Sequence, residues 1–573
     1  MQPTPIARLF SGLFSGRFAS HLAIAAALFA CATCTTDAID SNAATTGLTG
    51  GADAGAVADS GAPLDTGPVS PFAAEPRARI FLRDPVSDNE QLTEVTLVPP
   101  TTADGSLVSA SVAVLNCLNE EGGPPMRRYG MTVGSLCHET RIVLPDDDGH
   151  YLGTTPPADW SDQGDGFAEV QMYHHVNRIH DYFKDEHGLT DLDYPLEALV
   201  NVSFNVQVGP QKGWQGFPNA AFIPKEGFAQ LGLPDREHGA IVFGQYGKTD
   251  FCYDASVIYH EYTHAMIGTT RLQGSYPDQY GLDNLSGAMN EGFADYFAAS
   301  MSDLPVIGSY ALTFAGDQAL RDLTKPRYCP DDLTTEVHAD GKIIGSAMWA
   351  IRSALGPGQA DAIILRALQS FTQTTNLDQA GKLILAEAES EGVELAAKIE
   401  PILVKHGIIG CVRAKEYKDF NAFTSEDQVP YSVEGQGSLG MKLPDGVPGY
   451  VQFWVDLPPK TAGIALRWRA TTQGGWGGGA PAKLHVAVRR DKPVDFLLFA
   501  GGIVEADLKV QPAADPKSST DQKLTLGGAC LPKVGGRVYL MFLNTSDPAV
   551  QITHMFVDQL PDLTKADNVE ICD

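Results

Sequence analysis

Two histidines and a glutamate in the segment His260-Glu261-Tyr262-Thr263-His264 have the spacing of a metal-binding helix. Residues four apart lie on one face of an α-helix, so both imidazoles can reach one cation while Glu261 sits beside them. Neutral imidazole is a good zinc ligand, and a catalytic zinc site keeps one position open for water. With 14 histidines in the chain, a chance match is expected in only about 2% of such sequences. The motif therefore favours a zinc site over a helix that merely carries two histidines.

A later segment can supply a carboxylate to the same ion. Glu291 and Asp295 are also four residues apart, so one can bind the metal while the other accepts the remaining N–H of a histidine ligand. We predict Glu291 as the third ligand, with Asp295 and Asn290 supporting the ligands. Phe293 and Phe297 lie on a different face and are expected to anchor this helix in the core. A solvated acid is the alternative interpretation of Glu291, but its small and apolar neighbours favour a buried helix.

Both segments need helices to position them. Asp254 is suited to begin a helix around the histidines, and Gly268 is suited to end it. Apolar residues also recur at helical spacing from residue 167 to 183, and the pattern from 254 to 408 is dominantly helical.

Short β-rich runs separated by Pro, Gly and Asp flank the helical part. They occur before residue 157 and again between 200 and 250, and after Cys411 strands resume while helical periodicity disappears. We therefore expect an α+β fold with three parts, namely an N-terminal β subdomain (77–164), a catalytic domain (165–410) and a C-terminal β-sandwich (415–573).

The length and charge of the chain agree with this division and limit its partners. At 573 residues the chain is too long for one hydrophobic core. It carries 41 Lys and Arg against 70 Asp and Glu, a formal net charge of −29. Binding of phosphates needs clustered Lys and Arg, and no such run occurs, so the sequence argues against a nucleic-acid partner.

The first 34 residues have the pattern of an export signal. Two arginines precede an apolar run, residues 22–30, that is too short to span a bilayer. The sequence Leu28-Phe29-Ala30-Cys31 resembles a bacterial lipobox, in which the cysteine is lipidated, whereas cleavage after Ala32 would release a soluble protein. Both outcomes place the protein outside the cytoplasm. Residues 35–76 follow as a disordered linker, because they have almost no large apolar side chains.

Cysteine usage agrees with an oxidising compartment. Seven cysteines remain beyond the signal region, and none forms a C-x-x-C pair typical of a zinc ribbon. Sequence alone does not determine how cysteines pair. By proximity along the chain we expect disulfides Cys117–Cys137, Cys252–Cys329 and Cys530–Cys572, with Cys411 left over.

The segments H-E-Y-T-H (260–264) and N-E-G-F-A-D (290–295) together resemble the gluzincin metallopeptidases. The 26 residues between His264 and Glu291 are similar to the interval in fungalysins rather than to the shorter one in thermolysin. The resemblance covers about residues 165–410. It implies a thermolysin-like, two-lobed metallopeptidase, with a β-rich first lobe, a helical second lobe, one catalytic zinc ion (Zn2+) and a protein or peptide substrate.

The same resemblance gives roles to four further residues. Asn219 and Ala220 stand in a segment similar to the edge strand that pairs with substrate backbone. Arg321 stands in one whose arginine binds a substrate carbonyl. His338 stands in one that supplies a transition-state histidine.

The chain departs from the family pattern at three points. The long inhibitory propeptide of the family would not fit in the residues before Gly166. The tyrosine that assists the transition state has no counterpart at matching spacing, which leaves Tyr276 or Tyr280. The acid that orients His338 has none either, which leaves Asp332 or Asp340.

The expected chemistry is hydrolysis of a peptide bond by metal-activated water, with Glu261 as general base and His338 stabilising charge on the carbonyl oxygen. One alternative is a non-catalytic, surface-anchored binding protein with a structural metal site. The glutamate beside the first histidine argues against it, since a structural site needs no base. A second alternative is a zinc aminopeptidase. No acidic signature for capture of a substrate amine lies near the motif, and the strand-pairing segment favours an endopeptidase.

The C-terminal domain resembles the β-sandwich appendages of secreted bacterial peptidases, which implies binding to a carbohydrate, a protein or a surface polymer. Two acidic loops have residues suited to calcium (Ca2+), although a solvated acidic loop is the simpler interpretation. They are Asp146-Asp147-Asp148 and the series Asp159, Asp162 and Asp165.

Overall fold

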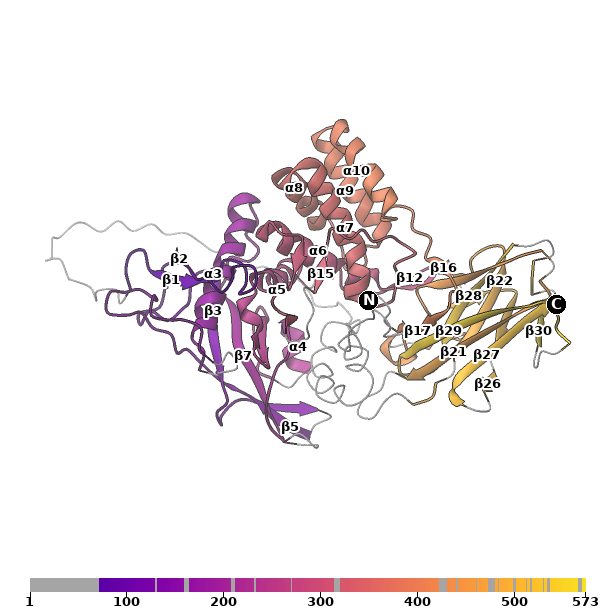
Figure 1. Cartoon of the computed structure of the whole chain (residues 1–573), viewed down its shortest axis with the longest axis horizontal. Helices are drawn as coiled ribbons and strands as arrows, with labels where there is room; N and C mark the ends of the chain where they lie inside the picture. Colours follow the sequence, from indigo (N-terminus) through magenta and orange to yellow (C-terminus); the bar gives the residue numbers. More distant parts are fainter. Residues whose placement is uncertain are drawn as a thin grey trace, which may run out of the picture.

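The structure, a computed structural model, describes residues 72–572, with gaps at 129–130, 159–163, 208–211, 231–232, 269–270, 314–319, 422–429, 440–441, 460, 473–479, 483, 498–500, 512, 516–517, 529, 533–535 and 565–568. The predicted export signal and most of the predicted linker lie outside these residues. In chain order the described part has a β-rich region, a helical region and a second β-rich region (Figure 1). This mixed arrangement confirms the predicted α+β class. None of the helices described has the length and apolar character needed to cross a bilayer.

The first region is built on a nine-stranded sheet. Its centre consists of three parallel strands, β3 (Val112–Leu118), β7 (Leu196–Val206) and β10 (Ala240–Tyr246). They are buried along almost their whole length, which is typical of parallel strands covered on both faces. The edge strand β9 (Ala220–Ile223) runs antiparallel to β10. The sheet also contains β4 (Pro125–Arg128), β5 (Met131–Leu136), β6 (His138–Thr140), β8 (Gly213–Gly216) and β11 (Thr249–Asp250), while β1 (Arg77–Ile80) and β2 (Thr93–Thr96) form a separate pair.

This sheet crosses the predicted boundary between residues 164 and 165. β3 lies before the boundary and pairs in parallel with β7, which lies after it. β5, also before the boundary, pairs antiparallel with β7. Parallel strands need a long crossover, and here the crossover contains the first long helix, so neighbours in the sheet are far apart in the sequence. The predicted N-terminal subdomain therefore shares one sheet with the start of the predicted catalytic domain.

The helical region confirms the helical pattern predicted from the sequence. The helix around the histidines, α5 (Ala255–Ile267), begins at Asp254, whose Oδ1 accepts the Ser256 N–H at 3.1 Å. It ends at Gly268, which adopts φ 69°, a conformation that favours glycine. The other helices are α3 (Phe167–Asp181), which continues into a π-helical turn (Tyr182–Glu186), α4 (Lys225–Gln230), α6 (Leu285–Ser302), α7 (Val337–Leu355), α8 (Pro357–Gln369), α9 (Leu377–Glu391) and α10 (Val393–Lys405).

Helix α6, which carries the predicted carboxylate ligand, is buried on nearly all sides. Phe293 and Phe297 are fully buried, as predicted. The Phe297 ring meets Phe183 edge-on at 5.4 Å between centroids, and the Phe293 ring meets Phe371 at the same distance. Edge-to-face aromatic contacts of this kind add to the free energy gained by burial. The two phenylalanines therefore fix α6 against the π-helical turn after α3 and the segment that follows α8.

The last region contains a six-stranded and a seven-stranded sheet, which lie beside the helical region (Figure 1). The two sheets pack face to face, with Trp468 of one and Phe542 of the other 5.1 Å apart. The first sheet consists of β16 (Ala414–Glu416), β19 (Val447–Pro448), β20 (Gln452–Leu457), β22 (Leu484–Arg490), β25 (Leu508–Val510) and β28 (Gly536–Asn544). The second consists of β17 (Phe420–Asn421), β18 (Tyr431–Val433), β21 (Gly463–Thr472), β26 (Ala513–Asp515), β27 (Ser518–Gly528), β29 (Val550–Leu560) and β30 (Val569–Cys572).

Three further strand pairs lie outside the large sheets. They are β12 (Tyr276–Asp278) with β13 (Gly281–Asp283), β14 (Val306–Ile307) with β15 (Arg321–Asp322), and β23 (Asp495–Leu497) with β24 (Ile503–Glu505).

The disulfides agree only in part with the predicted pairing. Cys117 and Cys137 are bonded, as expected. Cys329 is bonded to Cys411 rather than to Cys252, which is a buried free thiol, so the prediction for these three cysteines was wrong. Four helices lie between Cys329 and Cys411 and return the chain to its starting point, whereas Cys252 is enclosed at the start of α5. Cys530 is also disulfide-bonded. The side chain of Cys572, its predicted partner, lies outside the described part of the structure.

Replacement of Phe293 by alanine tests how much the burial of α6 contributes to stability. Loss of a fully buried phenylalanine leaves a cavity, so Phe293→Ala should lower the free energy of unfolding by about 3–5 kcal/mol. Chemical denaturation of the two proteins measures the difference. Val393→Ala is a suitable control, because Val393 is 77% exposed and its truncation should change stability by no more than about 0.5 kcal/mol. Equal stability losses in both variants would contradict this account of α6.

Candidate metal centre

His260, His264 and Glu291 converge where α5 meets α6. The two histidine Nε2 atoms are 3.0 Å apart. Glu291 Oε2 lies 3.2 Å from His260 Nε2, and Glu291 Oε1 lies 3.7 Å from His264 Nε2. One ligand atom from each residue lies within 4.8 Å of the others. In the part of the chain that the structure describes, no other group of three His, Cys, Asp or Glu side chains meets this criterion.

Two glycines let the backbones of α6 and α7 approach closely beside Glu291. A Cβ on Gly292 would lie 2.4 Å from Ile344 Cγ2 and 2.5 Å from the carbonyl oxygen of Gly341. Side chains larger than hydrogen are therefore excluded at this crossing. The close approach brings His338, at the start of α7, near the metal ligand, with Nε2 3.5 Å from Glu291 Oε2.

The donor atoms and their surroundings fit a zinc ion. Two imidazoles and a carboxylate are a usual zinc ligand set. Glu291 Oε2 is buried and has no hydrogen-bond partner, a costly condition that a bound cation would relieve. Burial lowers the pKa of His260, but Asp295 and Glu291 outweigh this and raise the pKa to about 9. The local potential therefore favours positive charge at the point where the three ligands meet.

Each of the two candidate histidine ligands contacts a side chain of α6 through its Nδ1 atom. Asp295 Oδ1 lies 2.9 Å from His260 Nδ1, and Asn290 Oδ1 lies 2.7 Å from His264 Nδ1. When Nδ1 donates its proton to these oxygens, Nε2 is left free to bind a metal. Asp295 is fully buried, and burial raises the pKa of its carboxyl, but Arg321 and His260 outweigh burial and lower it. It is thus held as a carboxylate.

Glu336, which the sequence analysis missed, is the acid that contacts His338. Glu336 Oε1 lies 2.6 Å from His338 Nδ1, and its other oxygen accepts the Ala339 N–H at 2.8 Å as the N-cap of α7. The expectation that Asp332 or Asp340 takes this place was wrong, because Asp332 accepts the Tyr328 N–H and Asp340, in the first turn of α7, accepts the Thr334 N–H. An acid at the N-cap faces the first turn of its helix, so the position of Glu336 two residues before His338 was a usable signal.

The carboxylates of Glu291 and Glu336 raise the pKa of His338. Partial desolvation lowers the pKa of the imidazole, but Glu291 and Glu336 outweigh it and raise the pKa to about 10. Burial raises the pKa of Glu336, and the neighbouring His338 outweighs this and lowers it to about 2. The side chain of His338 is 52% exposed, so the imidazole beside Glu291 is accessible to solvent.

Glu261 faces the edge of the nine-stranded sheet. Its Oε2 accepts the Phe222 N–H of β9 at 2.7 Å. The carbonyl oxygen of Asn219 is used on the opposite side of the strand, where it accepts the Gly244 N–H of β10 at 3.0 Å. Because backbone groups alternate between the two sides of a strand, the N–H and C=O of Ala220 point to the same side as the Phe222 N–H. That side is the one beside Glu261.

Comparison with known protein families identifies the region that contains this centre. Residues 151–355 match the family model described as "Fungalysin metallopeptidase (M36)". This segment is a fungalysin metallopeptidase domain. Fungalysins are gluzincin metalloendopeptidases that use zinc and are secreted, and the disulfides agree with an oxidising compartment. The match includes α5, α6, β9 and α7 as far as Leu355. No curated protein matches the chain closely enough to be named as a relative.

In the fungalysin domain Arg321, on β15, lies behind the candidate metal ligands. Its Nε donates to Asp295 Oδ1 at 2.7 Å, and an Nη lies 3.4 Å from His260 Nδ1. The guanidinium therefore compensates the buried carboxylate behind His260. Contact between Arg321 and a substrate carbonyl stays a prediction.

Of the two suggested tyrosines, Tyr280 is not brought to the centre by any contact in the described residues. Tyr280 lies in the turn between β12 and β13, where the Arg413 guanidinium is 5.6 Å from its ring centroid, at the junction with the C-terminal sheets. The side chain of Tyr276 lies outside the described part of the structure.

The acidic loops outside the centre have hydrogen-bonding roles where they are described. Asp146 Oδ1 accepts the Asp148 N–H at 3.1 Å, which stabilises a turn. Asp165 accepts the N–H at the start of α3 through Oδ1 at 2.8 Å. Asp159 and Asp162 lie outside the described residues. Calcium binding by these loops stays a prediction.

Removal of the acceptor behind His264 should weaken metal binding by the fungalysin domain. Loss of such a supporting hydrogen bond typically costs 10–100-fold in metal affinity, so we expect Asn290→Ala to raise the zinc dissociation constant by about that factor. Competition with a chromophoric chelator measures it. Asn290→Asp keeps an acceptor and should retain an affinity nearer to wild type. Equal zinc affinity in Asn290→Ala and wild type would remove Asn290 from the supporting set.

Proposed function

We propose that the chain is an exported zinc endopeptidase in which Glu261 is the general base for hydrolysis of internal peptide bonds. The observation that carries this proposal is the position of Glu261. It directly follows the ligand His260, and its Oε2 is held by the Phe222 N–H at the edge of β9. The carboxylate thus stands between the candidate metal ligands and a strand edge to which a peptide can add by backbone hydrogen bonds.

Each catalytic residue then has a defined task. Zinc held by His260, His264 and Glu291 would supply a Lewis acid that acidifies water and polarises the scissile carbonyl. Glu261 accepts a proton from the attacking water at the oxygen that Phe222 does not engage, and it delivers this proton to the nitrogen of the leaving amine.

The remaining predicted residues bind and orient the substrate. His338 donates a hydrogen bond from Nε2 to the carbonyl oxygen as negative charge develops on it. Asn219 and the backbone of Ala220 hold an extended peptide along β9, and Arg321 contributes a contact to a substrate carbonyl. The outward direction of the Ala220 backbone groups, on the side of Glu261, supports this arrangement.

The same arrangement favours an endopeptidase over an aminopeptidase. A strand edge binds the backbone of an extended peptide without requiring a free terminus. A structural metal site in a binding protein is disfavoured for a different reason, since it gives no role to a glutamate placed beside the ligands.

We further propose a thermolysin-like, two-lobed catalytic region followed by an accessory β-sandwich over residues 415–573. The β-rich region that carries β9 and the helices that carry the ligands would be the two lobes. The face-to-face packing of the two C-terminal sheets supports the sandwich. Its ligand is proposed as a surface polymer or a protein.

Conversion of Glu261 to glutamine tests the assigned base. The amide cannot accept the proton of water, so we expect kcat to fall by about 10²–10⁴-fold while one zinc ion per chain is retained. Cleavage of an internally quenched peptide blocked at both ends measures the activity, and it excludes an aminopeptidase, which needs a free amine. Glu226→Gln, at an exposed site on α4, is the control and should keep full activity. Full activity of Glu261→Gln would rule out Glu261 as the general base. Failure of the wild-type protein to cleave the blocked peptide would rule out the endopeptidase assignment.

Export is tested at the first 34 residues. Deletion of residues 1–34 should leave the protein in the cytoplasm of the producing cell, because it removes the predicted signal. Cell fractionation followed by immunoblotting measures the location. Cys31→Ser in the full chain separates the two forms of export. It should release the protein from membranes if Cys31 carries a lipid, and it should change nothing if cleavage follows Ala32. Secretion of the truncated chain would contradict the proposal.

A further inference from the structure

The loop that leads into His338 has an unusual conformation that needs outside support. Thr335 has φ 76°, a left-handed conformation that β-branched residues rarely adopt. Asp340, in the first turn of α7, fastens the loop from the inside. Its Oδ1 accepts the Thr334 N–H at 2.6 Å, and its Oδ2 accepts the Thr335 N–H at 3.0 Å. Glu336, which follows Thr335 in the chain, is the residue whose carboxylate contacts His338.

The C-terminal sheets hold the same loop from the outside at three points. The Tyr450 hydroxyl donates to Asp340 Oδ2. The Ser432 N–H of β18 donates to Thr335 Oγ1 at 2.6 Å. Lys415 Nζ of β16 donates to the carbonyl oxygen of Leu333 at 2.7 Å. Tyr450 and Asp340 are both almost fully buried, so the first of these bonds is shielded from water.

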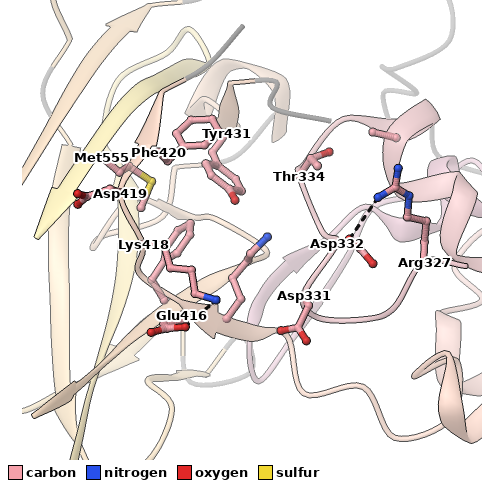
Figure 2. Close-up of a pocket in the computed structure, with 13 residues that line it drawn as sticks. Arg327, Asp331, Asp332, Thr334, Glu416, Lys418, Asp419, Phe420, Tyr431 and Met555 are labelled. Carbon is pink, nitrogen blue, oxygen red and sulfur yellow. Dashed lines mark ion pairs between the residues drawn. The ribbon is translucent and has the colours of Figure 1, made fainter. Parts of the chain in front are cut away.

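A cavity separates part of the loop before α7 from the C-terminal sheets, so the two surfaces do not pack continuously against each other. Figure 2 shows it between the loop with Asp331, Asp332 and Thr334 on one side and Phe420, Tyr431 and Met555 of the C-terminal sheets on the other. Its volume is about 390 Å³. Beside this cavity, three hydrogen bonds connect the loop to the C-terminal sheets.

A second contact connects the C-terminal sheets to the helix of the third metal ligand. Arg413, almost fully buried, donates to Asp278 Oδ2 at 2.6 Å and to Asp283 Oδ2 at 2.7 Å in the β12–β13 hairpin. Asp283 Oδ1 in turn accepts the Leu285 N–H, the first of α6, at 2.8 Å. The C-terminal region is therefore hydrogen-bonded beside the start of α6, which carries Glu291, and to the first turn of α7, which carries His338.

We propose that Tyr450 is a positioning residue of the peptidase, and that the C-terminal sheets hold the loop of residues 333–336 so that Glu336 presents His338 to the substrate. This inference rests on the proposed role of His338 in the reaction. The C-terminal region is thus an integral part of the catalytic apparatus, in addition to any binding role of its own.

Three variants in the full chain, together with one control, test the inference. Tyr450→Phe removes the hydroxyl, and Thr335→Val removes the acceptor of the Ser432 N–H, while Thr335→Ser keeps it. We expect kcat on the blocked peptide to fall about ten-fold in Tyr450→Phe and Thr335→Val, since small displacements of a catalytic group are costly. KM and zinc content should stay within about two-fold of wild type, and Thr335→Ser should retain nearly full kcat. Arg467→Gln, which breaks an exposed ion pair with Asp558, is the control and should change nothing.

A double-variant cycle distinguishes positioning from general loosening of the fold. If Tyr450 acts through His338, Tyr450→Phe should have no further effect on kcat in a His338→Ala background. Unchanged kcat in Tyr450→Phe and Thr335→Val, or an equal loss with and without His338, would overturn the inference. Thermal unfolding of each variant verifies that the protein is folded, and Thr335→Val carries the test if Tyr450→Phe does not fold.

The failure of the underlying proposal has a different signature. If His338→Ala alone leaves kcat unchanged, the role of His338 is wrong, and the inference falls with it. If His338→Ala lowers kcat strongly while Tyr450→Phe and Thr335→Val do not, the role of His338 stands. Only the positioning of the loop by the C-terminal sheets is then rejected.

Discussion

The need to compensate buried charge dominates the architecture around the metal centre. Glu291 and Asp295 lie one helical turn apart on a helix that is buried on nearly all sides. Unpaired carboxylates in such a place would greatly destabilise the fold, so both lie close to groups that can carry positive charge. His260 contacts both, Arg321 pairs with Asp295, and His338 approaches Glu291 from the next helix. A divalent cation held by His260, His264 and Glu291, as proposed, would complete this balance of charge.

This balance requires helices that approach one another closely. Phe293 and Phe297 fix α6 on its apolar sides, and Gly292 with Gly341 allows α7 to cross it at short distance. The nine-stranded sheet contributes the other wall, where the edge strand β9 meets Glu261. The side chains around the candidate centre therefore come from helices and a strand edge fixed by packing, an arrangement that preserves precise distances better than free loops.

The C-terminal sheets are tied into the same arrangement rather than attached by a free linker. The Cys329–Cys411 disulfide joins the loop before α7 to the segment that leads into β16. Arg413 follows at once and is buried between two aspartates of the β12–β13 hairpin. Buried ion pairs of this kind demand fixed geometry, because each partner would be left uncompensated if the surfaces moved apart. The position of the C-terminal region is thus coupled to the elements that flank the metal centre.

The sequence by itself determined what depends on local spacing. The pairs His260 with His264 and Glu291 with Asp295 could be placed on one helical face, and Asp254 and Gly268 marked the ends of α5, because a helix repeats within a few residues. Tertiary structure alone decided which distant groups meet. Segments far apart in the chain are joined by the disulfide of Cys329 with Cys411 and by the contact of Tyr450 with Asp340. The same is true of the pairing of β3 with β7, which lie on opposite sides of residue 164. The contact of Glu336 with His338 was within reach of a local argument, whereas only the packing of α7 on α6 brings His338 to Glu291. The physical reason is that local backbone geometry fixes the first kind of relation, whereas packing and charge compensation among distant segments fix the second.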